Sequence, residues 1–167
     1  MDLDEHFMDE ALAEAEKALA QGEFPVGCVL VHRGRVLARG FRTGTAGGGG
    51  NELDHAEIAA LRRLPESAVP FEAGAVTAYC TLEPCLMCFG ALLIAGIGRV
   101  VYAFEDVMGG AAACDRSRWS PLYRERAIAV RSGPRRAESL ALFKKFFADP
   151  QQNYWRGSLL ATYALEQ

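Results

Sequence analysis

Three residues of the chain, His55, Cys85 and Cys88, have the side chains and the spacing of a zinc site. Cys85 and Cys88 are separated by two residues at the predicted start of a helix, where about 60° separates their side chains around the helix axis. Both sulfurs can therefore reach one ion. A helix N-terminus also lowers the pKa of a thiol, and thiolate is the form that binds metal. His55 opens the preceding predicted helix, which brings a third ligand to the same place.

Glu57 follows His55 by two residues, a spacing that turns the two side chains about 200° apart within a helix. They converge only if the metal lies over the open end of the helix, and Asp54 as the N-cap would place them there. Two thiolates balance the charge of Zn²⁺, and three protein ligands leave a fourth position for water. Zinc lowers the pKa of that water, and Glu57 is placed to accept its proton. The pattern predicts one catalytic zinc ion per chain.

Two other interpretations of the cysteines are open. A CxxC motif that follows a strand and opens a helix is also typical of a thiol–disulfide redox pair. A closed structural zinc site is the second alternative, with Cys28, Cys80 or Cys114 as the fourth ligand. A redox pair leaves the upstream His-Ala-Glu unexplained, and a structural site lacks the second CxxC of a zinc ribbon. The joint pattern therefore favours the catalytic zinc site.

The elements that position these residues alternate between strands and helices. Periodicity predicts helices over 4–20, 55–64, 84–95, 134–148 and 154–165, and strands over 26–31, 35–41, 75–80, 99–104 and 127–131. A helix and a hairpin followed by alternating strands and helices predict an α/β fold, with three α/β/α layers around a five-stranded mixed sheet. The later β-α-β crossover should be right-handed, with its two strands parallel.

His55-Ala56-Glu57 together with Pro84-Cys85-Leu86-Met87-Cys88 resembles the H-x-E…P-C-x-x-C signature of the zinc-dependent cytidine/adenosine deaminase superfamily. Other segments look like the bacterial tRNA adenosine deaminase branch. These segments are Phe24 to Gly27, Thr81 to Cys85, Arg99 to Tyr102, and Asp106 followed by Gly110 to Ala112. The likeness covers residues from about 4 to 148, which is nearly the whole chain.

By this resemblance, His55, Cys85 and Cys88 are zinc ligands and Glu57 carries protons. The resemblance also implies the cytidine deaminase-like fold and a homodimer, and the backbone around Leu82 to Cys85 would help to hold the base. The candidate substrate contacts are Arg42, Leu82, Glu83, Pro84, Asp106, Tyr154 and Trp155.

Two departures from the branch bear on the substrate: an Asn is missing after the second strand, and the loop before His55 is glycine-rich and longer than the compact loop expected. The second strand of the branch usually ends Gly-aromatic-Asn, with the Asn contacting the base, whereas this chain reads Gly40-Phe41-Arg42-Thr43. The chain also continues past the predicted deaminase domain, residues 1–148, into an extension over 149–167 that we expect to pack on the same domain. Tyr154 and Trp155 either pack in a last helix or close the pocket, as C-terminal segments do in free-base deaminases that resemble this branch.

Composition excludes several other classes. The chain has 167 residues, half of them hydrophobic, which is enough for one globular domain without disulfides. A net charge of −3 excludes a uniformly basic nucleic-acid binder but not a local basic patch. The longest uncharged stretch, Pro84 to Gly98, is too short to span a bilayer. The acidic N-terminus and the odd number of cysteines predict a cytoplasmic protein with no signal peptide and no membrane partner.

Charge is unevenly distributed along the chain. Residues 1–23 carry eight acids, and residues 116–156 carry ten bases that either form solvated faces or contact an anionic substrate. We predict hydrolytic deamination of a nucleobase amino group, with adenosine in tRNA, converted to inosine, as the leading substrate. A free base or nucleoside such as guanine, cytosine or adenine is the alternative. Two alternatives come from other classes of protein. One is a thiol–disulfide protein that uses Cys85 and Cys88, and the other is a non-catalytic RNA-binding domain that kept the zinc. Glu57 argues against the RNA-binding domain, because a structural zinc site does not need that carboxylate.

Overall fold

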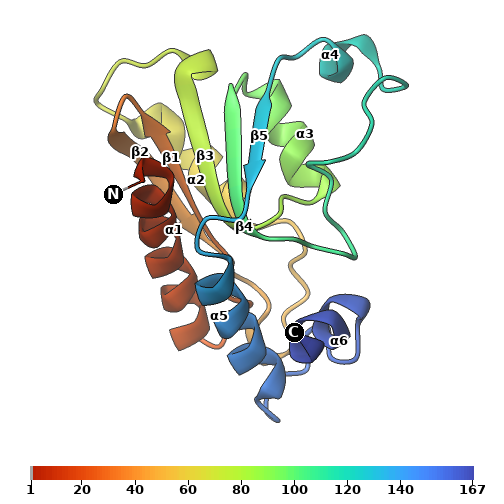
Figure 1. The fold of residues 1–167 in the computed structure, drawn as a ribbon. Coiled ribbons are helices and arrows are strands. Elements are labelled where there is room, and N and C mark those ends of the chain that lie inside the picture. Colours follow the sequence, from red (N-terminus) through yellow and green to blue (C-terminus); the bar gives the residue numbers. More distant parts are fainter. Residues whose placement is uncertain (1) are drawn as a thin grey trace.

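The computed structural model describes residues 2–167 and contains one five-stranded mixed sheet in the order β2-β1-β3-β4-β5 (Figure 1). Strand β1 is antiparallel to both β2 and β3, whereas β3, β4 and β5 are parallel to one another. The strands are β1 (Gly27–His32), β2 (Arg35–Phe41), β3 (Val76–Leu82), β4 (Arg99–Phe104) and β5 (Ala129–Ser132). The predicted α/β fold with a mixed sheet is confirmed.

Helices cover both faces of this sheet. Helix α1 (Leu3–Ala20) packs on one face with α5 (Arg136–Ala148) beside it, and α2 (Ala56–Arg63) and α3 (Leu86–Ile94) pack on the other. The short α4 (Pro121–Arg124) precedes β5, and α6 (Leu159–Glu166) ends the chain next to α5. Single 3₁₀ turns span Ala46–Gly48, Leu64–Glu66 and Ala73–Ala75. None of the helices within 2–167 is long and apolar enough to cross a bilayer.

Three predicted helix starts are wrong. The N-cap of α2 is His55 and not Asp54, because Asp54 instead accepts hydrogen bonds from Asn51 and Arg62. Helix α3 begins two residues after Pro84, since the Pro84 carbonyl accepts the Ala111 N–H and Cys85 forms a β-bridge with Gly110.

The last helix begins at Leu159 and not at Tyr154. Trp155 and Gly157 both have positive φ angles, of 56° and 71°, which a helix cannot accommodate. Ser158 then caps α6 by accepting the Ala161 N–H. Tyr154 and Trp155 consequently lie in a turn ahead of the helix.

Two glycines let helices approach the sheet closely. A Cβ atom on Gly27 would lie 2.1 Å from the Ala11 carbonyl oxygen of α1, and one on Gly40 would lie 2.3 Å from the Ala56 carbonyl oxygen of α2. Any side chain at either position would push the helix away. Gly40 therefore fixes where the start of α2 sits on the sheet.

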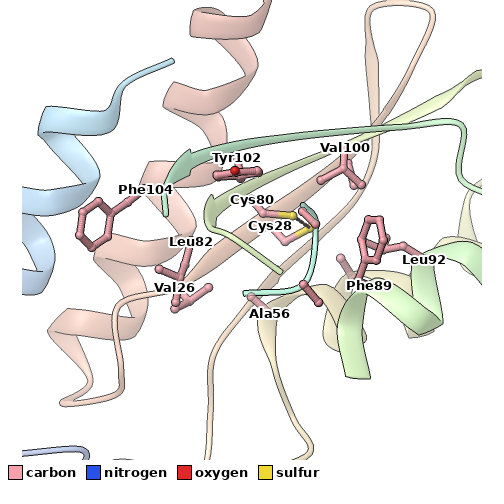
Figure 2. Packing of buried hydrophobic residues seen from close by; sticks show 14 of the residues in the cluster. Val26, Cys28, Ala56, Cys80, Leu82, Phe89, Leu92, Val100, Tyr102 and Phe104 are labelled. Atoms are coloured by element: carbon pink, nitrogen blue, oxygen red, sulfur yellow. Dashed lines mark hydrogen bonds between the residues drawn. The ribbon is translucent and has the colours of Figure 1, made fainter. Parts of the chain in front are cut away.

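The core beneath α2 and α3 is formed by alternate residues of the central strands (Figure 2). Cys28 of β1 and Cys80 of β3 occupy paired positions, and their Sγ atoms lie 3.8 Å apart in a fully buried environment. They pack with Ala56 and Phe89 as small apolar residues, the usual behaviour of buried free cysteines.

The acidic α1 is tied to basic residues that come much later in the chain. Asp4 is buried and accepts hydrogen bonds from Arg99 at 2.7 Å, from Tyr79 at 2.8 Å and from Arg131, and these contacts lower the pKa of its carboxyl to about 2. Arg135 bonds Asp9 at 2.8 Å. Basic residues of the segment 116–156, such as Arg131 and Arg135, thus form ion pairs within the fold.

Candidate functional site

A cavity of about 630 Å³, including its open mouth, lies at the carboxyl ends of β3 and β4. This edge of a parallel sheet is where α/β proteins usually place their sites. Six of the seven predicted substrate contacts line it; Pro84 does not. The lining residues are Phe24, Val26, Arg42, Glu52, His55, Ala56, Glu57, Leu82, Glu83, Cys85, Asp106, Met108, Gly109, Tyr154, Trp155 and Leu160.

Two helix starts bring the predicted metal ligands together on the inner side of this cavity. His55 is the N-cap of α2, Cys85 is the N-cap of α3, and Cys88 lies in the first turn of α3. One ligand atom from each residue lies within 4.8 Å of the others, and the His55 Nδ1 to Cys85 Sγ distance is 3.6 Å. Zinc bonds of about 2.1 Å to nitrogen and 2.3 Å to sulfur, at a tetrahedral angle, require about 3.6 Å between such atoms. The donor set therefore fits a zinc ion.

The electrostatics of the two cysteines differ. The Cys88 thiol and the His55 imidazole beside Cys85 lower the pKa of the Cys85 thiol to about 4, against the opposing effect of burial. The contact with Cys85 and burial together raise the pKa of the Cys88 thiol. For His55, burial lowers the pKa, but the neighbouring Cys85 and Glu57 outweigh it and leave the pKa raised. A Cys85 thiolate is thus already favoured before any metal binds.

Glu57 lies in the first turn of α2 and lines the cavity with only 3% of its surface exposed. Burial is the main cause that raises the pKa of its carboxyl, and the neighbouring Cys85 adds to it. A buried carboxyl beside a candidate metal site is placed to accept and return protons.

No other histidine, cysteine or carboxylate group among residues 2–167 forms a comparable cluster. Cys28 and Cys80 face each other in the core, and Cys114 is exposed. None of the three joins His55, Cys85 and Cys88 as the fourth ligand that a closed structural site requires. His55 and Cys85 line the cavity, so the cluster borders it.

Glu83 and Asp106 line the cavity, but their carboxylates mainly brace the loop after β4. Glu83 accepts the backbone N–H groups of Asp106 and Ala112, each at 3.2 Å. Asp106 accepts those of Met108 and Gly109, each at 3.0 Å. A Cβ on Gly110 would lie 2.4 Å from the Glu83 carboxyl carbon, so only glycine fits there.

Among the cavity-lining residues that sequence reasoning missed, Phe24 and Glu52 contact Tyr154. Phe24 is buried and contacts the Tyr154 ring edge-on, with 5.2 Å between ring centroids. The Phe24 to Gly27 motif was the sequence feature that could have identified Phe24 as a site residue. Glu52 lies in the glycine-rich loop, and its carboxylate accepts the Tyr154 hydroxyl at 2.9 Å. No local pattern marks Glu52, since the contact joins residues far apart in the sequence.

Comparisons with known proteins agree with this geometry. Residues 1–104 match the cytidine and deoxycytidylate deaminase zinc-binding region. A tRNA-specific adenosine deaminase of Agrobacterium fabrum is 38% identical over 149 residues, covering 86% of this chain and 93% of the relative. A solved structure from a study of A-to-I editing by tRNA deaminases superposes with a TM-score of 0.67 at 38% identity, covering 82% of this chain and 98% of the other.

A second solved structure carries a small ligand. A mutant protein in complex with 8-azaguanine has a TM-score of 0.69 at 25% identity, covering 87% of this chain and 85% of the other. The chain therefore belongs to the zinc-dependent cytidine and deoxycytidylate deaminase family, and it is an enzyme of the hydrolytic deaminase class.

The ligand geometry predicts which cysteines retain metal. Cys85→Ala or Cys88→Ala should each lose bound zinc and lower the melting temperature, because the ion joins the starts of α2 and α3. Cys28→Ser and Cys114→Ser should keep one zinc per chain in metal analysis of the purified protein. Loss of zinc from Cys114→Ser would show that the ligand set is wrong.

Proposed function

We propose that His55, Cys85 and Cys88 hold one Zn²⁺ and that Glu57 is the general acid and base of a nucleobase deamination. The convergence of these four side chains at one end of the cavity carries the proposal. Zinc, when bound, activates water as a nucleophile at neutral pH. This role requires a fourth position that is open to water, and the cluster borders the cavity.

Glu57 moves the protons of the reaction. Water adds to the ring carbon that bears the amino group, and Glu57 accepts the proton that the water gives up. Glu57 gives this proton to the adjacent ring nitrogen, then takes the remaining hydroxyl proton and transfers it to the amino group. The C–N bond breaks, ammonia leaves, and the hydroxyl oxygen becomes the carbonyl. The burial and raised pKa of Glu57 make it able to hold a proton between these transfers.

For the substrate, we favour adenosine in tRNA, which the reaction converts to inosine. The support comes from relatives named tRNA-specific adenosine deaminase, which match over most of the chain. An adenosine in a tRNA loop would have to turn out of its stack for its amino edge to reach Glu57.

A free base or nucleoside is the second candidate, and the distribution of charge favours it. Arg131, Arg135 and Arg136 bind the carboxylates of Asp4, Asp9 and Glu105, which leaves them unavailable to phosphates. The exposed Arg126 lies near Ala129, which pairs with Arg99 at the amino end of β4, whereas the cavity lies at the carboxyl end. The cavity is also partly closed by Tyr154 and Trp155.

The proposal extends to assembly and location. Leu86, Met87 and Ile94 form an exposed apolar face on α3, beside a groove bounded by Trp119 and Tyr123. We propose that this face pairs with a second copy in a homodimer. We also propose a cytoplasmic location, and a single deaminase domain, residues 1–148, on which the extension 149–167 packs through Leu160 and Ala164.

Glu57→Gln should fold and keep its zinc but lose turnover by about 10²–10⁴-fold or more, because the amide cannot carry protons. Ammonia release and zinc content measured on the same preparation test this. Turnover close to that of the unmodified enzyme would remove Glu57 from the mechanism.

The two substrate candidates differ in their response to salt. If RNA is the substrate, ammonia release from a tRNA anticodon stem-loop should fall steeply from low to moderate salt, since each neutralised phosphate adds about one unit to the slope of log affinity against log salt. Adenine, guanine, cytosine and their nucleosides, assayed in parallel, should show little turnover, and Glu57→Gln gives the background. Salt-insensitive turnover of a free base, with none on the stem-loop, would establish the second candidate.

Placing a charge on the α3 face should break the homodimer. Ile94→Asp is expected to sediment as a monomer at concentrations where the unmodified chain is dimeric, because a buried unpaired carboxylate opposes association. Leu3→Asp, at an exposed apolar position on α1, serves as the control and should leave the dimer intact. A dimer that survives Ile94→Asp would place the interface elsewhere.

A further inference from the structure

The outer wall of the cavity is formed by two segments that are far apart in the sequence. One is the loop from Thr43 to Asp54, which contributes Glu52, and the other is the turn at Tyr154 and Trp155 in the C-terminal extension. Arg42 lies between them. It is the largest fully buried side chain in the described chain, with 2% of its surface exposed.

The guanidinium of Arg42 is bound on nearly every side by these two segments. Nη1 donates to the carbonyls of Thr43 and Asp54, the latter at 3.2 Å, and Nη2 donates to the carbonyl of Asn51 at 2.8 Å. Three carbonyls of one loop thus converge on a single side chain. A buried charge is stable only when its donors are satisfied in this way.

The same guanidinium reaches the C-terminal extension. Nη2 lies 3.5 Å from the Tyr154 hydroxyl and 3.6 Å from the Glu52 carboxylate, and the Tyr154 hydroxyl donates to Glu52 at 2.9 Å. The guanidinium carbon also lies 5.8 Å from the centre of the Tyr154 ring, within the range of a cation–π contact. Arg42, Glu52 and Tyr154 therefore form a closed triangle of contacts across the wall.

We propose that Arg42 is a positioning residue that builds the substrate cavity by fastening the C-terminal extension to the loop 43–54. Its terminal N–H groups are committed to protein oxygens, so position 42 does not read the polar edge of the base. In the related branch, an Asn at this position contacts the base. In this chain the wall instead presents aromatic surface to the substrate.

Local backbone geometry supports this role for the wall. Trp155 adopts a left-handed conformation with a φ angle of 56°, which a bulky residue takes up only when the surroundings hold it there. Its ring lies edge-on to Tyr154 with 5.7 Å between ring centroids, and Tyr154 in turn contacts Phe24. The contacts of Arg42 to Tyr154 are among those that hold this turn, and the aromatic face suits a planar heterocycle.

Hydrogen exchange provides a test that needs no substrate. In Arg42→Gln, peptides covering residues 150–158 should exchange about tenfold faster or more than in the unmodified protein, since a hydrogen-bonded charge is lost from the wall. Tyr154→Phe should accelerate the same peptides to a smaller extent, and adding it to Arg42→Gln should have a smaller effect than it has alone, because only the hydrogen bond to Glu52 is then left to lose. Arg62→Gln removes an exposed arginine that pairs with Asp54 and should leave these peptides unchanged.

Kinetics provide the second measurement, and this one rests on the proposed deaminase function. With the substrate that releases ammonia, Arg42→Gln should raise KM about tenfold, with kcat within about threefold and zinc content unchanged. Arg42→Lys should recover part of the loss because it keeps the charge. Arg42→Asn, which restores the amide of the related branch, should behave like Arg42→Gln.

Several outcomes would overturn the proposal. These are unchanged exchange over 150–158 in Arg42→Gln, a fall in kcat at constant KM, or a higher kcat/KM in Arg42→Asn. If Arg42→Gln fails to fold, Tyr154→Phe provides the test, because it leaves the three loop carbonyls bound to Arg42. Unchanged exchange over 150–158 and unchanged KM in Tyr154→Phe would reject the positioning role of Arg42. The hydrogen-exchange result does not depend on whether any tested substrate releases ammonia. A failure of the proposed deaminase function can therefore be distinguished from a failure of the role proposed for Arg42.

Discussion

The site depends on the close contact between α2 and β2 at Gly40. Without a Cβ at that position, the carbonyl of Ala56 can approach the strand, and the open end of α2 then faces the same point as the start of α3. His55 and Cys85 are both N-caps with extended backbone angles, so each directs its side chain over its own helix end rather than along the helix. The positions of the two helices therefore determine the ligand cluster. Cys28 and Cys80 lie beneath it in the core and contribute to the position of the helices only through packing.

The convergence of His55, Cys85 and Cys88 was predictable, because each of these residues lies at the start of a helix and short separations there determine direction. The structure has His55 and not Asp54 as the N-cap of α2, and this was not predictable. The Asp54 side chain binds Asn51 and Arg62 instead of the backbone of the helix. Arg42 lines the cavity as predicted, but its burial could not be predicted from local sequence. A charged residue after a strand normally lies in solvent, and its burial depends on contacts with a loop and a terminus that no periodicity reveals.

Charge that is segregated along the chain is paired in space. The acids of α1 face arginines near β5 and the start of α5, and Asp4 alone binds Arg99 and Arg131. Such pairs involve partly exposed partners, so each adds modestly to stability, whereas together they set α1 against the sheet. The number of basic residues in a sequence segment therefore overestimates how many of them are free to bind a ligand. The cavity mouth is accordingly bounded more by aromatic and acidic side chains than by free cations.

The contact between Arg42 and Tyr154 joins positions 112 residues apart, and this has a consequence during synthesis. The proposed metal ligands lie between residues 55 and 88, so they leave the ribosome well before the segment that completes the cavity. A nascent chain therefore contains the proposed ligands and all five of its strands while the substrate cavity is still open on one side. The part of the chain that forms the cluster and the part that completes the cavity are therefore synthesised at different times, and a chain cut short before residue 154 would lack one wall of the cavity.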